Sequence, residues 1–220
     1  VHSDIVAHYI LNIGTENQKH TYLPKMVSGE CIGAIAMTEP AAGSDLQGIK
    51  THAKFDGSNW ILNGSKTFIT NGQHADIVIV AAKTNLDSKG SSGISLFLVE
   101  TNVDGFSKGR NLEKLGLHSS DTSELFFDDL KLSKESIMGE IDKGFFAMMQ
   151  ELPRERLALA VNAVAASRGM LDITSNYVKE RRAFGKPIAK FQNLRFKFAQ
   201  METKYRLNSS FIKECLNLFH

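Results

Sequence analysis

Residues 150–160, QELPRERLALA, carry two glutamates four positions apart, Glu151 and Glu155. At 100° per residue, Glu155 falls inside the edge of an apolar helical stripe, and Glu151 lies nearer its margin. The stripe consists of Phe145, Met148, Leu152 and Leu159. The helix after residue 156 is apolar almost all round, so we expect it to be buried in a bundle, where a poorly solvated carboxylate suits proton abstraction. A surface network of both glutamates with the neighbouring arginines is the alternative, and Pro153 can kink the helix and turn Glu155 either way.

A second stretch that could carry chemistry is MTEPAAGSD, residues 37–45, which follows a short apolar run. Exposed backbone N–H groups and short hydroxyls in such a loop can hydrogen-bond a flat heteroaromatic ring or a phosphate. A plain turn punctuated by Pro40 and Gly43 explains the same residues. The stretch lacks the GxGxxG spacing and the following helix of a Rossmann site.

Residues 67–72, TFITNG, alternate hydroxyl and apolar side chains before an Asn-Gly turn. Side chains alternate along a strand, so Phe68 and Thr70 share one face. An aromatic ring beside a hydroxyl suits a stacked, hydrogen-bonded ring ligand. A half-buried hairpin strand without a ligand gives the same pattern.

Basic residues gather in ERRAFGKPIAKFQ, residues 180–192. Arg181, Arg182 and Lys186 lie near a helix end, where cations complement the helix macrodipole. The functional interpretation is that a guanidinium here grips a phosphate.

Helices at both ends of the chain must position these motifs. Residues 2–29 have helical periodicity that is broken at Gly14, with Thr15 as an N-cap and a stop at Gly29. From about residue 134 the helical period returns, with one long helix over 142–180 and a second beginning near Phe191. The break between them falls at Gly185 and Pro187.

Short strand-like runs bounded by turn residues fill residues 32–130. FDGSNW (55–60) and LNGSK (62–66) carry the DG and NG signals of hairpin turns. We therefore predict an antiparallel β sandwich or barrel. The predicted domains are 1–31, 32–133 and 134–220, and a β domain placed between helical regions makes a cleft at their junction, a common ligand site.

Composition excludes several classes of protein. The net charge is +2 and there is no long block of basic residues, so we predict no nucleic-acid partner. Two widely spaced cysteines and seven histidines without HxxxH or HExxH spacing predict no disulfide framework and no metal site. The sequence has no run of about 18 consecutive apolar residues, so we predict no membrane span. Both ends of the chain look cut from something longer.

In this order, MTEPAAGSD, ITNG and RRAFGKPI closely resemble the acyl-CoA dehydrogenase family, and the resemblance extends over essentially all 220 residues. GTENQKHTYLPKMVSGE is similar to the helix that enters the family's β domain, and DTSELFFDDLKL to its last strands. AIAMTEP, ELPRERL and YVKERRAFGK are most similar to the long-chain acyl-CoA dehydrogenase branch. The resemblance implies an α+β multidomain fold: the end of an N-terminal helical domain, a middle β domain and the first part of a C-terminal helical domain.

The resemblance also implies FAD as cofactor, bound between the β domain and the C-terminal helices. The residues that would contact FAD are Met37, Thr38, Gly43, Ser44, Phe68, Thr70, Arg181, Phe184 and Gln192. Thr38 would hydrogen-bond the ring edge, Phe68 would stack on the ring, and Thr70 would lie near N5. Ser44 would border both the pyrophosphate and the substrate. Arg181, Phe184 and Gln192 match residues that reach the FAD of a neighbouring subunit, which implies a homodimer or homotetramer.

By the same resemblance, the protein would oxidise an acyl-CoA, medium to long or branched, to the trans-2-enoyl-CoA in fatty-acid β-oxidation. Glu155 would be the catalytic base and Arg156 would lie beside CoA. Electrons would pass to an electron-transferring flavoprotein, in the mitochondrial matrix or the bacterial cytoplasm. The alternatives are an acyl-CoA oxidase that uses oxygen, or a catalytically silent flavin- or CoA-binding fragment that lacks the family's remaining helices.

The chain departs from the family's pattern in two places. Ala41 replaces the usual glycine of EPGAGSD, which puts the close approach of the loop to the cofactor in doubt. Ala183 stands where many members have threonine, so one phosphate or ribose contact is expected to be missing.

Overall fold

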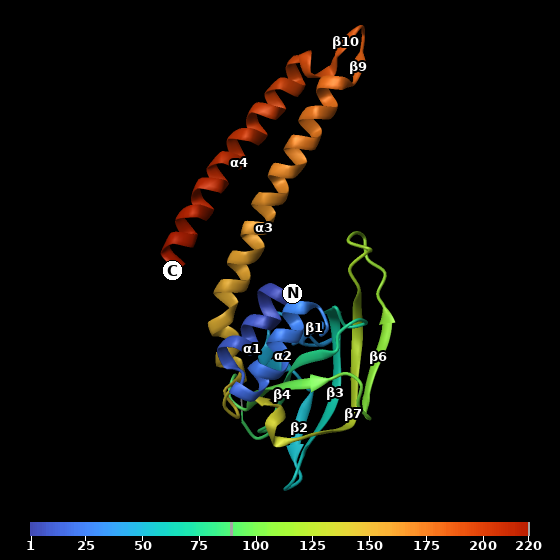
Figure 1. Ribbon diagram of the computed structural model, residues 1–220, viewed down its shortest axis with the longest axis vertical. Coiled ribbons are helices and arrows are strands. Elements are labelled where there is room, and N and C mark those ends of the chain that lie inside the picture. Colours follow the sequence, from blue (N-terminus) through green and yellow to red (C-terminus); the bar gives the residue numbers. More distant parts are fainter. Residues whose placement is uncertain (89, 220) are drawn as a thin grey trace. The chain divides into compact units, whose positions relative to one another are not determined.

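The computed structural model describes residues 1–88 and 90–219, and Figure 1 labels its elements. A π-helical turn, His2–Val6, leads into α1 (Ala7–Ile13) and α2 (Glu16–Ser28). The predicted limits of α2 are confirmed. The Thr15 hydroxyl accepts from the Gln18 N–H at 3.2 Å, and the Gln18 side chain accepts from the Thr15 N–H at 3.0 Å. Gly29 ends the helix with a left-handed φ of 83°, so both ends satisfy their backbone groups locally.

The middle region forms one mixed sheet within the described residues, in the order β6-β7-β3-β2-β4-β5-β8, with β1 beside β4. The strands are β1 (Gly33–Ala36), β2 (His52–Phe55), β3 (Trp60–Thr70), β4 (Ile77–Lys83), β5 (Ile94–Glu100), β6 (Phe106–Asn111), β7 (Thr122–Leu132) and β8 (Ile137–Met138). Short 3-10 helices lie at Leu46–Gly48 and Lys134–Ser136. The predicted order of helices, β domain and helices is confirmed.

The strand directions correct one part of the prediction. Most strand pairs are antiparallel, as predicted, but β1 runs parallel to β4 over its whole length, and His52 of β2 makes a parallel bridge to Lys83 of β4. The two strands of each pair are joined by long stretches of chain, and no turn motif signals such a pairing.

The two hairpin signals have different outcomes. FDGSNW does form the turn between β2 and β3, with Phe55 opposite Trp60. LNGSK does not form a turn: it lies inside β3, where the register with β7 shifts between Leu62 and Gly64. Gly64 has a φ of 141°, and a Cβ there would lie 2.6 Å from the Thr51 Cα. The glycine is therefore required by a bulge and a close backbone approach.

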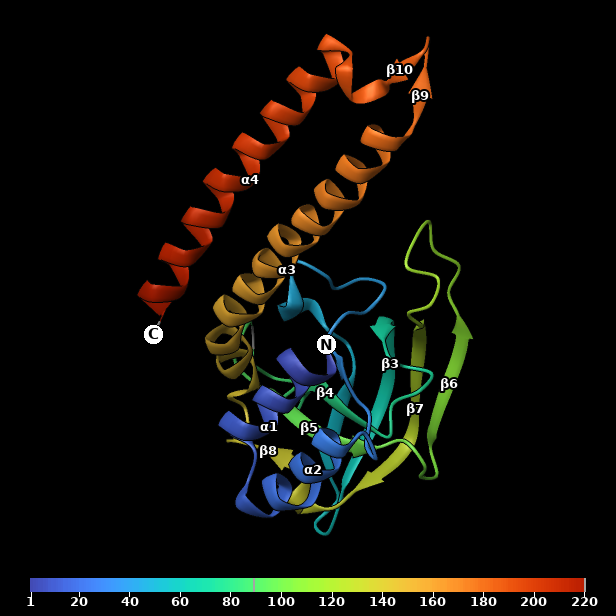
Figure 2. The ribbon, with the colours of Figure 1, turned by 45° about the horizontal axis from the view of Figure 1, so that its top comes forward.

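Hydrophobic clusters cover both faces of the central strands. Along β4, Val78, Val80 and Ala82 pack in one cluster with Trp60 and Phe97. The alternate residues Ile77, Ile79 and Ala81 pack in a second cluster with Tyr9 and Ile10 of α1. Period-two alternation places these sets on opposite faces, and Figure 2 shows α1 and α2 beside the sheet. Each fully buried large aliphatic side chain contributes about 1.5–3 kcal/mol to folding.

The helical end of the chain is a hairpin of α3 (Gly144–Glu180) and α4 (Gln192–Phe219), whose antiparallel course is visible in Figure 1. The connection holds the short strands β9 (Arg182–Ala183) and β10 (Lys186–Pro187) and a 3-10 turn, Ile188–Lys190. Both predicted helices and the predicted break are confirmed. Pro153 lies inside α3, and the helix continues through it.

The predicted burial of α3 in a bundle is not found within the described residues. Leu159 is 63% exposed and Ile173 is 70% exposed, because α4 is the neighbouring helix of this hairpin and covers one side of α3. An 18-residue window of α3 has a mean hydropathy of 1.2 and is 6% buried, which meets the length and composition of a membrane-crossing helix. Core helices of soluble proteins meet the same test, so this is weak evidence for a membrane span.

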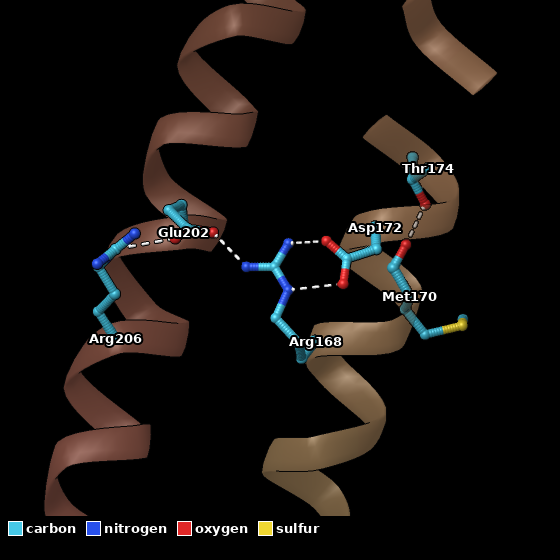
Figure 3. A network of polar contacts seen from close by, with 6 residues as sticks. All are labelled: Arg168, Met170, Asp172, Thr174, Glu202 and Arg206. Carbon is cyan, nitrogen blue, oxygen red and sulfur yellow. Dashed lines mark hydrogen bonds and ion pairs between the residues drawn. The ribbon is translucent and has the colours of Figure 1, made fainter. Parts of the chain in front are cut away.

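A polar network joins α3 to α4 (Figure 3). The Arg168 guanidinium donates to both oxygens of Asp172, at 2.6 and 3.1 Å, and to Glu202 of α4 at 2.8 Å. Arg206 donates to the other oxygen of Glu202 at 2.8 Å. The Arg168 guanidinium also lies over the Tyr205 ring, 5.0 Å from its centre. Arg168 and Asp172 are one turn apart on α3, and Glu202 and Arg206 are one turn apart on α4, so the contacts link one turn of each helix.

By its contacts, the chain divides into two compact units, Val1–Glu151 and Leu152–His220. The first unit holds the sheet with α1, α2 and the start of α3. The second holds the rest of α3, the β9–β10 turn and α4.

Candidate functional site

Hydrogen bonds join two of the motifs in the first unit, at the ends of β1 and β3. The Thr67 N–H donates to the Thr38 carbonyl at 2.9 Å. The Lys66 ammonium donates to the Met37 carbonyl at 3.0 Å. Met37 and Thr38 are partly exposed. The fold therefore brings the start of MTEPAAGSD against the start of TFITNG, although the two motifs are far apart in sequence.

Phe68 is presented to solvent by an irregular stretch of β3. Its side chain is 67% exposed, and its φ of 59° lies in the left-handed region. The register between β3 and β7 shifts between Lys66 and Ile69, and Thr70 is partly exposed beyond the shift. Left-handed backbone at a bulky residue is strained, and such strain gathers at functional sites. The bulge thus holds an aromatic ring outward where a packed strand would bury it.

The loop after β1 turns tightly and then opens. Glu39 and Ala42 exchange backbone hydrogen bonds of 2.8 and 3.0 Å around Pro40 and Ala41. Ala41 is exposed, and its φ is not positive. The turn therefore forms without the glycine that the family pattern has at this position.

Gly43 and Ser44 are exposed beyond this turn. A Cβ added to Gly43 would meet nothing within 4 Å, and φ there is not positive. Neither packing nor backbone conformation within the chain explains the glycine. An exposed small residue and a hydroxyl on one segment, with an exposed aromatic ring on the segment hydrogen-bonded to it, suit a flat ring with a phosphate tail.

A buried ion pair beneath the loop was not anticipated from the sequence. The Lys66 ammonium lies 2.8 Å from Glu39 Oε1, and the two side chains are 0% and 5% exposed. Burial lowers the pKa of Lys66 to about 8, against the opposing attraction of Glu39. Burial acts to raise the pKa of Glu39, but Lys66 and hydrogen bonds from Lys50 and Thr51 outweigh it and hold that pKa below its usual range.

A sequence signal for the pair does exist. Trp60 and Leu62 face inward on β3, and period-two alternation puts Lys66 on the same face. A lysine at an inward strand position requires a partner.

One of the two glutamates of α3 differs from the prediction. Glu151, predicted as a helix-margin charge, is 8% exposed, and its Oε1 accepts from the Asn12 side chain at 2.8 Å. Asn12 lies far away in sequence, on α1, so helical periodicity could not reveal this contact. Glu155 is partly exposed and Arg156 is exposed. The predicted stripe is buried at Met148 but not at Leu159.

The remaining predicted residues lie in and around the connection between α3 and α4. Phe184 and Gly185 have φ of 51° and 78° between Ala183 and Lys186, which pair as neighbouring strands. Positive φ at both central residues is typical of a type I′ turn. Phe184 is 93% exposed, while Arg181 precedes the turn and Gln192 begins α4.

Glu155 and this tip lie far apart on the same helix. At 1.5 Å per residue, Glu155 and Arg181, which directly follows α3, are separated by roughly 39 Å along the axis of the helix. The described residues of the second unit therefore hold two separate groups of predicted site residues. No cluster of three or more His, Cys, Asp or Glu side chains suited to a metal ion occurs in residues 1–88 and 90–219.

The chain matches one family of known proteins along almost its whole length. Models of the N-terminal, middle and C-terminal domains of acyl-CoA dehydrogenase match residues 1–30, 34–130 and 142–219. The mitochondrial long-chain specific acyl-CoA dehydrogenase of Sus scrofa is 54% identical over 99% of the chain and 51% of that relative. The chain thus spans about half the length of the curated relatives it matches.

Solved structures also match almost the whole chain. The crystal structure of an acyl-CoA dehydrogenase from Geobacillus kaustophilus has a TM-score of 0.94 at 50% identity, covering 98% of this chain and 57% of that one. A glutaryl-CoA dehydrogenase from Mycobacterium smegmatis, in complex with FADH2, has a TM-score of 0.88 at 34% identity, covering 96% and 53%.

Proposed function

We propose, given that this chain belongs to the acyl-CoA dehydrogenase family of oxidoreductases, that the protein is an FAD-dependent acyl-CoA dehydrogenase. Its substrate would be a medium- to long-chain or branched acyl-CoA, oxidised to the trans-2-enoyl-CoA in β-oxidation. The observation that carries the proposal is the junction of residues 37–45 with residues 67–72. There an outward aromatic ring, hydroxyls and an open glycine lie on adjoining segments.

The residues of this junction fit the parts of FAD. Phe68 offers an exposed face for stacking on the isoalloxazine. Thr38 and Thr70 would offer hydroxyls to its polar edge, Thr70 on the N5 side, and Met37 would line the ring. The open space at Gly43 allows the pyrophosphate to approach the backbone, and Ser44 offers a hydroxyl to the pyrophosphate and the substrate.

The proposed reaction removes two hydrogens from adjacent carbons. Glu155 would accept the α-proton, leaving the electron pair of that C–H bond to form the new double bond. Arg156, which is exposed, would lie beside the CoA moiety. FAD supplies, when bound, the acceptor for the hydrogen and electron pair that leave the β-carbon. Glu155 must therefore be ionised before reaction and protonated after it.

The hairpin tip would serve a second copy of the protein. A group roughly 39 Å from Glu155 along one helix cannot serve the site that Glu155 serves. We propose that Arg181, Phe184 and Gln192 contact the FAD of a neighbouring subunit in a homodimer or homotetramer. An electron-transferring flavoprotein would take the electrons, and the compartment would be the mitochondrial matrix or the bacterial cytoplasm.

Glu155→Gln tests the assignment of the base. The variant should keep its flavin, while bleaching of the flavin absorbance by acyl-CoA should slow about 10²–10⁴-fold, the usual contribution of a general base. Glu151→Gln is the matched control, because it makes the same change one turn earlier in α3. Bleaching of Glu155→Gln at the unsubstituted rate would exclude Glu155 as the base. Peroxide formation without an added electron acceptor would indicate the oxidase alternative.

A further inference from the structure

One carboxylate closes the base of the loop formed by residues 40–49. Glu39 stands at the start of this loop, and the N–H groups of Lys50 and Thr51 stand at its end. The Lys50 N–H donates to Glu39 Oε2 at 2.6 Å, and the Thr51 N–H donates to Oε1 at 3.0 Å. The start and end of the loop that carries Gly43 and Ser44 are therefore held by one buried side chain.

Lys66 ties this closed loop to β3. Its ammonium donates to Glu39 Oε1 at 2.8 Å and to the Met37 carbonyl at 3.0 Å. Thr67, the next residue, donates its N–H to Thr38 at 2.9 Å. The residue after that is Phe68, so the anchored Lys66 lies only two peptide units before the exposed ring.

An apolar substitute could not do the same. A carboxylate can accept from two backbone N–H groups and an ammonium at the same time, with charge-assisted bonds. If either partner is removed, the other is left as a buried charge with its hydrogen bonds incomplete. The pair thus fixes the relative positions of three chain segments that all lie beside the junction described above.

We propose that Glu39 and Lys66 are positioning residues for FAD, a role that rests on the proposed function. The two residues are called the Glu39–Lys66 pair below. Neither side chain would touch the cofactor, because both are buried. The pair acts through Thr38, Gly43 and Ser44 on one segment and through Phe68 and Thr70 on the other. Its effect is to hold the ring-stacking and phosphate-approach elements in one geometry before FAD binds.

The test compares Lys66→Met and Glu39→Ala with the unsubstituted protein, purified without flavin and titrated with FAD. Both variants should bind FAD about tenfold or more weakly, a loss of about 1.4 kcal/mol. The visible circular dichroism of the bound flavin should change, because ring and protein are no longer held in one arrangement. Glu39→Gln keeps one oxygen as an acceptor and should lose less affinity than Glu39→Ala.

Leu130→Ala is the matched control for general destabilisation. Leu130 is fully buried on β7, opposite Leu62, and belongs to neither segment of the junction. It should lower the melting temperature and leave the FAD affinity of the folded protein and the flavin spectrum unchanged. Backbone hydrogen exchange on the flavin-free proteins adds a second measurement. In Glu39→Gln the Lys50 N–H should exchange faster than in the unsubstituted protein, and the N–H of Leu130 should exchange at the same rate.

The outcomes separate the two proposals. If the unsubstituted protein binds no FAD, the proposed function and the positioning role both fail. If it binds FAD, but the variants match it in affinity, flavin spectrum and exchange at Lys50, the positioning role alone is overturned. Should Lys66→Met or Glu39→Ala not fold, Glu39→Gln carries the test with the same readouts.

Discussion

The Glu39–Lys66 pair and the Arg168 network use the same chemistry in opposite surroundings. The side chains of the first pair are 0% and 5% exposed. Those of Arg168 and Asp172 are 33% and 62% exposed, and Arg206 is 76% exposed. In the network, a hydrogen bond from Arg168 lowers the pKa of Glu202, but water and salt reach every partner.

These surroundings decide what each ion pair is able to specify. Burial makes the Glu39–Lys66 pair costly to break, so it can hold segments that are distant in sequence in a single arrangement. The exposed network adjusts the register of two helices that already lie side by side, and each of its members can find water instead. We therefore expect substitutions in the two regions to differ in size, in pH dependence and in salt dependence.

The largest effect should follow from Lys66→Met. It leaves the Glu39 carboxylate buried without its counter-charge, and breaking one side of a buried pair costs about 3–5 kcal/mol in the free energy of unfolding. Denaturant unfolding, followed by the fluorescence of Trp60, measures it. Lys131→Met is the control, because Lys131 is exposed on β7 and its change should be close to zero. Equal costs for the two lysines would remove the contrast between buried and exposed charges.

A smaller effect should appear in acid. The pKa of Glu39 in the folded state is held below its ordinary value of 4.5, so the folded protein binds its proton less readily than the unfolded chain does. The stability that Glu39 contributes is therefore present above pH 4.5 and is lost as the pH falls through the lower, folded-state pKa. The difference in unfolding free energy between the unsubstituted protein and Glu39→Gln should shrink below pH 4.5. A difference that stays constant down to about pH 3 contradicts this account.

The same contrast explains what could be predicted from the sequence. Local signals succeed where their cause is local: Thr15 and Gly29 delimit α2, and Gly185 with Pro187 separates α3 from α4. Family motifs brought attention to Thr38 and Phe68, which the fold does place on adjoining segments. Their roles toward FAD stay predictions.

Contacts between distant segments could not be predicted in this way. Glu39 and Lys66 are 27 residues apart, and Asn12 and Glu151 are 139 residues apart. The parallel pairing of β1 with β4 likewise has no turn to announce it. Gly64 carried a turn signal, but a glycine with positive φ serves a bulge as well as it serves a turn. In each case the missing information was which segments meet.

The smallest effect should come from Arg168→Met, and salt should remove it. Arg168 bridges Asp172 and Glu202 on two helices, yet its partners are solvated, so its loss should destabilise the protein less than Lys66→Met does. At 1 M salt the Debye length falls to about 3 Å, which screens exposed pairs and leaves buried ones almost unchanged. The cost of Arg168→Met should therefore fade between about 0.05 and 1 M salt, while the cost of Lys66→Met persists. A salt-independent cost for Arg168→Met would mean that its contact with the Tyr205 ring, and not its ion pairs, joins the two helices.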